Sequence, residues 1–176
     1  MKKIVGYVLG VIGLLGVDWL TKYLAYVHLG DRSIPIIGEF LQLRYVENTG
    51  MAFGSFAGNE AVTTLVPVAC MIVLTAACFY FGYYFKKRNE EKTIKAIKIM
   101  FVFYIAGFLG NYVERIVNDR VIDFISFKGF AVFNMADIYA TVCQVLLIGV
   151  MGPFAWKYGK ERKTQKALEK QTQKNG

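Results

Sequence analysis

Four stretches of the sequence are apolar over a length that can cross a lipid bilayer. They cover residues 4–24, 61–85, 96–113 and 137–156, and a helix of about 20 residues spans the roughly 30 Å of hydrocarbon at about 1.5 Å per residue. Because lipid offers the backbone no hydrogen-bond partner, each stretch must be helical. The sequence therefore predicts an all-α membrane protein with four transmembrane helices.

The composition excludes a soluble domain of this size. Of the 176 residues, 55% are hydrophobic and only 19% are charged, and the mean hydropathy is +0.38; soluble domains are less apolar and more charged. The first apolar stretch follows Met-Lys-Lys, as in a signal peptide, but it lacks a small-residue cleavage site and runs on through Asp18 and Lys22. We expect it to be a retained first span.

Basic residues are concentrated at one set of helix ends. The amino terminus, residues 86–98 and the tail from residue 157 hold 15 of the 21 Lys and Arg but only 4 of the 13 acidic residues. Cytoplasmic segments carry such an excess, so both termini should be cytoplasmic and residues 25–60 and 114–136 external. The net charge of +8 then reflects topology and indicates no nucleic-acid partner. We expect one four-helix domain over residues 1–156 and a basic tail over residues 157–176, either a solvated helix extension or disordered.

The external segment between the first two spans has the pattern of β-strands. Residues 40–46 alternate between apolar and polar side chains, an Asn-Thr-Gly turn signal follows at residues 48–50, and residues 51–56 form a second short run. A segment of this length argues for structure rather than a slack loop. We therefore predict a small extracytoplasmic β-rich segment between helices 1 and 2, resting on the membrane surface.

Cysteine and histidine offer no metal or disulfide chemistry. Cys70, Cys78 and Cys143 fall inside apolar runs, without a Cys-x-x-Cys pair, and His28 is the single histidine. We expect no metal site, no disulfide framework and no cofactor.

Ionisable residues in or beside the spans are candidates for function, because a charged group at mid-helix costs about 2.5 to 3.5 kcal/mol on insertion scales. Asp18 lies about 22 Å along the first helix from Lys3, at about 1.5 Å per residue, and Lys22 follows on the same face. The pair could anchor the helix end at the interface. It could also support a site there.

The third span carries one face of small and polar residues. Gly107, Gly110, Asn111 and Glu114 recur at helical spacing, and Arg115 follows directly. Helix packing with a snorkelling arginine would explain them structurally. Their position at the outer membrane boundary also fits a site.

Two aspartates border the last span. Asp123 interrupts an apolar stretch near the interface, and no local partner is evident. Asp137 opens the fourth span three residues after Asn134, so the two could form a variant of the capping box. Capping does not require polar residues from five segments to project to one membrane face, yet this sequence places eight there: Asp18, Asn48, Asn111, Glu114, Arg115, Asp123, Asn134 and Asp137.

Five successive motifs resemble those of bacterial lipoprotein signal peptidase, the signal peptidase II family. They are Asp-Trp-Leu-Thr-Lys at residues 18–22, Asn-Thr-Gly-Met-Ala-Phe at 48–53, Gly-Phe-Leu-Gly-Asn-Tyr-Val-Glu-Arg at 107–115, Val-Ile-Asp-Phe at 121–124 and Phe-Asn-Met-Ala-Asp at 133–137. Their order and their four-span context both fit the family.

The resemblance implies an aspartic endopeptidase of the bacterial cytoplasmic membrane, monomeric and acting near the outer face. It would remove signal peptides from prolipoproteins on the amino side of a diacylglyceryl-modified cysteine, so the implied partners are that prolipoprotein and membrane lipid. Asp123 and Asp137 match the catalytic pair. The positions that match substrate-binding or supporting residues are Asp18, Lys22, Asn48, Gly50, Asn111, Arg115 and Asn134, and Glu114 stands beside them.

Three positions depart from the family pattern. Glu114 stands where the family usually has Asp, Met51 where a small residue is usual, and Asp119 where Gly is common. We expect the extra methylene of Glu114 to change how far its carboxylate extends beside Arg115 in a packed site.

Two other function classes are compatible with intramembrane carboxylates. An ion-coupled transporter would place them near the midplane on broken helices, whereas here they cluster at one face. A non-enzymatic scaffold would use every polar group as an anchor or cap, and it has no use for an unpartnered Asp123.

Overall fold

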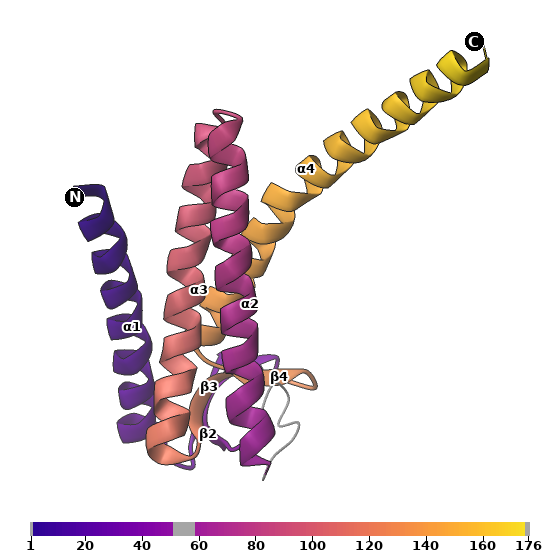
Figure 1. Cartoon of the computed structure of the whole chain (residues 1–176). Coiled ribbons are helices and arrows are strands. Elements are labelled where there is room, and N and C mark those ends of the chain that lie inside the picture. Colours follow the sequence, from indigo (N-terminus) through magenta and orange to yellow (C-terminus); the bar gives the residue numbers. More distant parts are fainter. Residues whose placement is uncertain (1, 51–58, 175–176) are drawn as a thin grey trace.

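A computed structural model describes residues 2–50 and 59–174 and contains four long helices. They are α1 (Lys2–His28), α2 (Glu60–Lys87), α3 (Glu91–Asn118) and α4 (Met135–Lys174) (Figure 1). Each contains a segment long and apolar enough to cross a membrane: Ile4–His28, Ala61–Lys87, Glu91–Asn118 and Met135–Lys160. These segments confirm four membrane-spanning helices and extend the predicted apolar stretches by a few residues.

Local capping determines where α2 begins and where α3 ends. The Asn59 side chain accepts the backbone N–H of Val62 at 3.2 Å and so starts α2. Asp119 ends α3 in the left-handed region, with φ of 57°, and its N–H bonds to the Arg115 carbonyl at 2.9 Å. Glycine adopts this conformation without strain, and Asp tolerates it better than most residues. The departure at Asp119 is therefore conformationally acceptable.

A four-stranded antiparallel sheet lies at one end of the helices (Figure 1). Its strands are β1 (Ser33–Ile37), β2 (Leu41–Asn48), β3 (Val121–Phe127) and β4 (Ala131–Phe133), in the spatial order β1-β2-β3-β4. β2 lies within the external segment where strands were predicted, but β3 and β4 come from the other external segment. The second predicted run, residues 51–56, lies outside the described residues.

Two glycines allow the helices to approach closely beside the sheet. A Cβ added to Gly107 would lie 2.8 Å from the carbonyl oxygen of Ala136, and one added to Gly110 would lie 2.7 Å from Oδ2 of Asp18. Real Cβ atoms do not approach other heavy atoms so closely. The small face of α3 is therefore a packing surface for α4 and for the Asp18 carboxylate of α1.

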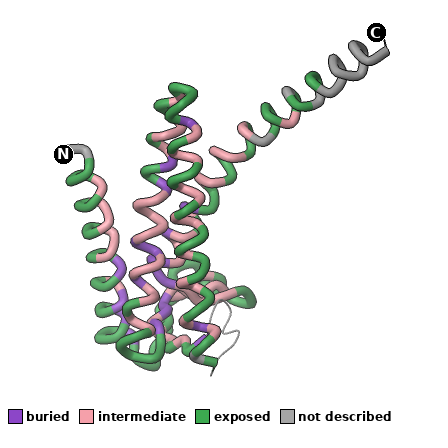
Figure 2. The backbone as a smooth tube through the Cα atoms, viewed as in Figure 1, coloured by how far each residue is buried: buried purple, intermediate pink, exposed green. Residues whose placement is uncertain are grey.

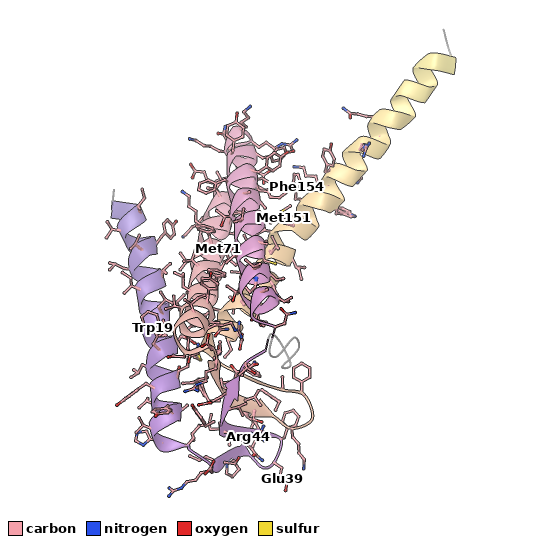
Figure 3. The ribbon with its side chains drawn as sticks, turned by 60° about the horizontal axis from the view of Figure 1, so that its bottom comes forward. Trp19, Glu39, Arg44, Met71, Met151 and Phe154 are labelled. Carbon is pink, nitrogen blue, oxygen red and sulfur yellow. The ribbon has the colours of Figure 1, made fainter. Side chains whose placement is uncertain are left out.

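Burial is greatest near the sheet and least along the outer helix faces (Figure 2). Large apolar side chains such as Leu9, Ile72 and Ile148 are more than 60% exposed, as expected of surfaces that contact lipid. Trp19 lies on α1. Glu39, in the turn between β1 and β2, and Arg44, on β2, lie far from Met151 and Phe154 of α4 (Figure 3). Both chain ends lie at the end opposite the sheet, where α4 leaves the other helices and continues to Lys174 as a helix extension (Figure 1).

Candidate active site

Asp123 is a buried carboxylate in the middle of β3. Its side chain is 3% exposed, because β2 pairs with β3 on one side and Asn134 covers it from the other. Asn48, at the end of β2, donates its side-chain amide to Oδ2 at 2.9 Å, and Asn134 donates to Oδ1 at 2.7 Å. The partners that were not evident from the local sequence are thus supplied by β2 and by the residue before α4.

Asp137 lies in the first turn of α4 and forms the capping interaction proposed from sequence. The Asn134 side chain accepts the Asp137 N–H at 3.1 Å, and the Asp137 carboxylate accepts the Asn134 N–H at 3.1 Å. Asn111 of α3 also donates its side-chain amide to this carboxylate, at 2.9 Å. Capping alone would not need the Asn111 contact, so Asp137 is both a cap and part of a wider polar cluster.

Asn134 joins the two carboxylates. It is fully buried, its side-chain amide bonds to Asp123 and its backbone N–H bonds to Asp137. The same amide nitrogen lies 3.0 Å from Oδ1 of Asn111 and 3.2 Å from the Ile122 carbonyl. One side chain therefore fixes the relative position of β3, α3 and the start of α4.

A second buried cluster supports the first from α1. Lys22 is 3% exposed, and its Nζ lies 2.9 Å from carboxylate oxygens of both Asp18 and Glu114. It also donates to Oδ1 of Asn111 at 2.9 Å and to the Gly110 carbonyl at 3.1 Å. Asp18 in turn accepts the backbone N–H of Ala136 in the first turn of α4. The lysine is thus compensated by two acids and linked through Asn111 to Asp137.

Glu114 and Arg115 are adjacent in sequence but bond to different partners. Glu114 pairs with Lys22 and accepts the Ile122 N–H at 3.1 Å, whereas Arg115 donates to the Gly50 carbonyl. The physical reason is helical: consecutive side chains point about 100° apart, at 3.6 residues per turn. The added methylene of Glu114 lets one carboxylate reach both a lysine and the backbone of β3.

Asn48 and Gly50 connect the sheet to this cluster. The Asn48 side-chain oxygen accepts the Gly50 N–H at 2.9 Å, an Asx-type turn, while its amide bonds to Asp123. Arg115 holds the same turn through the Gly50 carbonyl. Met51, the next residue, lies outside the described residues.

Burial beside a second carboxylate raises the pKa of Asp123 to about 7, mainly through desolvation and also through the charge of Asp137. The hydrogen bonds from Asn48 and Asn134 and the charge of Lys22 oppose this rise. A carboxyl group with such a pKa can hold a proton near neutral pH and release it readily. Such a group close to a second carboxyl group is suited to general acid–base chemistry.

All ten predicted site residues meet in this region, and among the described residues backbone groups that the sequence did not indicate also contribute. The N–H groups of Ala136 and Ile122 and the carbonyl of Gly110 bond to site side chains. Such groups carry no side-chain signal. Within residues 2–50 and 59–174, no three His, Cys, Asp or Glu side chains are grouped to hold a metal ion.

Comparison with known proteins gives consistent matches over most of the chain. The family model described as signal peptidase (SPase) II matches residues 10–152. The lipoprotein signal peptidase of Clostridioides difficile (strain 630) is 33% identical over 144 residues, covering 80% of this chain and 90% of the relative. That of Chlorobium phaeobacteroides (strain BS1) is 32% identical over 145 residues, covering 74% and 86%.

Two solved structures share the fold. Both are bacterial membrane enzymes determined by the in meso method, at 2.3 and 1.9 Å resolution, and both are 27% identical to this chain. The first has a TM-score of 0.64 and covers 84% of this chain and 88% of its own; the second has a TM-score of 0.62 and covers 84% and 93%.

Proposed function

The chain belongs to the signal peptidase II family, and on this premise we propose that Asp123 and Asp137 are its catalytic pair. Membership makes it a multi-pass membrane protease of the aspartic type that removes signal peptides from lipoproteins. The observation that carries the proposal is the position of Asn134, which hydrogen-bonds to both carboxylates inside a buried cluster.

The two carboxylates have environments suited to different protonation states. Asp137 lies at the start of α4, where the helix dipole favours an anion, and it accepts N–H donors from Asn111 and Asn134. Asp123 has a pKa raised to about 7 and therefore keeps its proton more readily. We assign Asp137 as the ionised member and Asp123 as the protonated member.

This assignment gives a complete acid–base sequence. Asp137 takes a proton from water as the water oxygen attacks the scissile carbonyl carbon, and Asp123 gives its proton to the carbonyl oxygen. Asp123 then takes a proton back from the tetrahedral intermediate, and Asp137 gives its proton to the leaving nitrogen as the C–N bond breaks. The products are the carboxyl end of the signal peptide and a free amine, and both carboxyl groups return to their starting states.

The remaining polar residues hold this geometry rather than react. Asn48, Asn111 and Asn134 donate amide hydrogens to the pair. Lys22, compensated by Asp18 and Glu114, fixes Asn111 through its side-chain oxygen. The residues that hydrogen-bond to Asp123 and Asp137 are thus held in place by further hydrogen bonds and ion pairs, which limits the motion of the two carboxyl groups.

The location of the cluster fits a lipid-anchored substrate. The carboxylates lie where α1, α3 and α4 meet the sheet, at the boundary of the apolar helical segments. We propose that this end faces outward, that both termini are cytoplasmic, and that a monomer cleaves on the amino side of a diacylglyceryl-modified cysteine. The lipid anchor would confine substrate to the membrane plane and raise its effective concentration at the site.

Cleavage by the purified protein tests this function. A synthetic prolipoprotein peptide with a diacylglyceryl-modified cysteine is incubated with the protein in detergent, without any ion gradient. The masses of the products are then measured by mass spectrometry. We expect one new amino terminus, at the lipidated cysteine. Cleavage elsewhere would contradict the proposed cleavage position, and no cleavage would contradict the proposed activity and favour the transporter or scaffold alternatives.

A further inference from the structure

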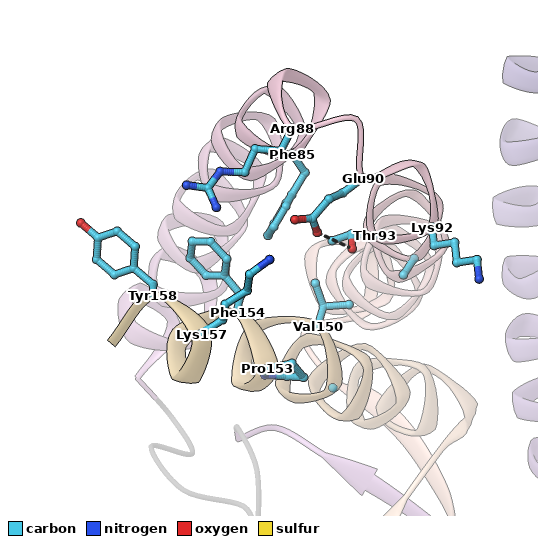
Figure 4. A pocket seen from close by; sticks show the side chains of 12 residues that line it. Phe85, Arg88, Glu90, Lys92, Thr93, Val150, Pro153, Phe154, Lys157 and Tyr158 are labelled. Atoms are coloured by element: carbon cyan, nitrogen blue, oxygen red, sulfur yellow. Dashed lines mark hydrogen bonds between the residues drawn. The ribbon is translucent and has the colours of Figure 1, made fainter. Parts of the chain in front are cut away.

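A cavity of about 630 Å³ lies among α2, α3 and α4, at the opposite end of the molecule from the carboxylates (Figure 4). Its wall includes Phe85 and Arg88 at the end of α2, Thr93 in the first turn of α3, and Phe154 and Lys157 in α4. A volume of this size is typical of sites for small organic groups, about 300–1,000 Å³. The proposed peptidase reaction makes no use of it.

The inner surface of this cavity is aromatic. Phe85 is fully buried and meets Phe154 edge to face at 5.1 Å between ring centroids, and Tyr84 meets Phe154 at 5.3 Å. Figure 4 shows the rings of Phe85 and Phe154 side by side at the centre, with Val150 below them. The half-buried side chains of Phe154 and Val150 offer acyl chains an apolar surface, and the buried Phe85 ring supports Phe154 from behind.

The rim of the cavity is basic. Arg88 and Lys157 line it together with a single acid, Glu90; neither cation forms an ion pair with a described residue, and the Arg88 guanidinium lies 4.7 Å from the centre of the Tyr84 ring. Lys92 also belongs to the lining, but its side chain points away from the cavity (Figure 4). Glu90 accepts a hydrogen bond from the Thr93 hydroxyl at 3.2 Å. The cavity therefore presents a net positive rim, which favours an anion.

The cavity exists because α4 diverges from α2 and α3 (Figure 1). Pro153 lies inside α4 and cannot donate a backbone hydrogen bond to Gly149, one turn earlier. Gly149 lines the cavity, and a Cβ added there would meet no atom within 4 Å. No protein side chain among the described residues therefore fills this position.

The residues around the cavity are typical of the interface between membrane and water. The apolar segments of α2 and α3 end here at Lys87 and Glu91. Lys87 lies 4.7 Å from the centre of the Tyr83 ring, and Lys160 lies 5.7 Å from that of Trp156. Aromatic rings beside basic residues are typical of the headgroup level.

We propose that this cavity binds an anionic glycerophospholipid, with the phosphate at Arg88 and Lys157 and an acyl chain against Phe154 and Val150. A lipid fits better than a free phosphate, because the cationic rim is continuous with an apolar aromatic wall at the membrane interface. This site is separate from the carboxylates and does not depend on which side of the membrane it faces.

Native mass spectrometry of the full chain in detergent tests the proposal, with phosphatidylglycerol and phosphatidylcholine of identical acyl chains as probes. The parent should retain phosphatidylglycerol with at least tenfold higher affinity. Arg88→Gln with Lys157→Gln should lose most of this preference. The matched control is Lys87→Gln with Lys160→Gln, which removes the same charge from cations outside the cavity and should bind within threefold of the parent.

Two leucine substitutions test the location of the lipid site without changing any charge. Gly149→Leu places a side chain in the cavity and should lower phosphatidylglycerol affinity at least tenfold, whereas Gly152→Leu, which lies in the same helix but does not line the cavity, should not. Circular dichroism checks that each variant is folded. Equal binding of the two lipids, or equal losses in the variants and their controls, would show only a nonspecific lipid shell and overturn the proposal.

Two further arms exclude other ligands. Glu90→Gln should leave phosphatidylglycerol binding unchanged or tighter. If phosphatidylethanolamine were preferred and lost in this variant, the site would recognise an ammonium group and the proposal would be wrong. Displacement of the lipid by millimolar inorganic phosphate would equally contradict it. Asp123→Asn should bind phosphatidylglycerol like the parent, so failure of the catalytic proposal would not affect this result.

Discussion

The carboxylate of Asp18 in α1 accepts the backbone N–H of Ala136 in α4 at 2.8 Å, across 118 positions of sequence. The first N–H groups of a helix have no partner within it, so a side chain from another helix caps α4 immediately before Asp137. Asp18 thereby couples the position of α1 to that of a proposed catalytic carboxylate.

Replacing Asp18 should therefore damage both stability and turnover. Asp18→Leu leaves Lys22 buried with one acid fewer and an uncapped Ala136 N–H, and we expect a loss of about 3 kcal/mol or more in the free energy of unfolding. Asp18→Asn retains an oxygen for Ala136 and should lose less. Thermal unfolding in detergent measures both. The exposed Asp31→Asn is the control and should change stability by less than about 0.5 kcal/mol.

Glu114→Asp should be tolerated, with turnover within about tenfold of the parent, roughly 1.4 kcal/mol in barrier. The charge beside Lys22 is retained, although the shorter side chain cannot keep both the Lys22 and the Ile122 contacts at their present lengths. Glu114→Leu should be far worse, because it removes one of the two acids that compensate a buried lysine. Initial rates of peptide cleavage distinguish the variants. Parent-like turnover of the Leu variant would show that Glu114 plays no part in the site.

The raised pKa of Asp123 makes both turnover and stability depend on pH. Since this carboxyl must be protonated in the proposed mechanism, kcat/KM should fall as the pH rises above about 7. For stability, the folded-state pKa lies above the unfolded value of 3.8, so the folded state binds the proton more tightly. The contribution of Asp123 to the free energy of unfolding is therefore fully present below pH 4 and is lost as the pH rises through about 7.

Comparison with Asp123→Asn isolates this stability effect, because Asn does not titrate. The free energy of unfolding of the parent, relative to that of the variant, should decrease as the pH rises from 4 to 7 and then stay constant. A difference independent of pH over this range would contradict a raised pKa.

The proposed orientation predicts that the sheet and the turn between α2 and α3 lie on opposite sides of the membrane. Single cysteines replace Ser33 in β1 and Lys95 in α3, both exposed, in a background without Cys70, Cys78 and Cys143. An impermeant thiol reagent added to intact cells should label the first, and the second should react only after the cells are opened. Labelling of both from outside would exclude this topology.

Much of the fold was predictable because lipid imposes a strong constraint on sequence. Four apolar stretches had to be helices, and the clustering of basic residues predicted how they alternate. The sheet was only partly predictable: β2 alternates clearly, but β3 carries Ile122, Phe124 and Ile125 around Asp123 and resembles an apolar interfacial run. Its pairing with β2 depends on contacts between segments that are about 75 residues apart, which no local pattern reports.

The site was predictable as a set of residues but not as a set of bonds. Conspicuous polar residues in apolar surroundings, together with motif resemblance, predicted ten positions, and these lie together in the structure. The pairing of Glu114 with Lys22 rather than Arg115 depended on which helix faces α3. The link through Asn134 required the residue between β4 and α4 to lie beside Asp123 of β3, and the capping role of Asp18 required a backbone partner, Ala136.

The central claim is that Asp123 and Asp137 act as one unit, each supplying half of a proton exchange that the other cannot supply. Asn is nearly isosteric with Asp, so Asp→Asn variants should fold. Were Asp137 only a helix cap, Asp137→Asn would cost at most about 1 kcal/mol of stability and leave turnover near that of the parent.

The most direct measurement is cleavage of a diacylglyceryl-modified substrate peptide by purified Asp123→Asn, Asp137→Asn and the double variant, with thermal stability measured alongside. Each single variant should lose at least about a thousandfold in turnover, roughly 4 kcal/mol in barrier. The double variant should be scarcely slower than either, because residues that act as a unit are non-additive. Substantial turnover by either single variant, with its fold intact, would contradict the catalytic pair.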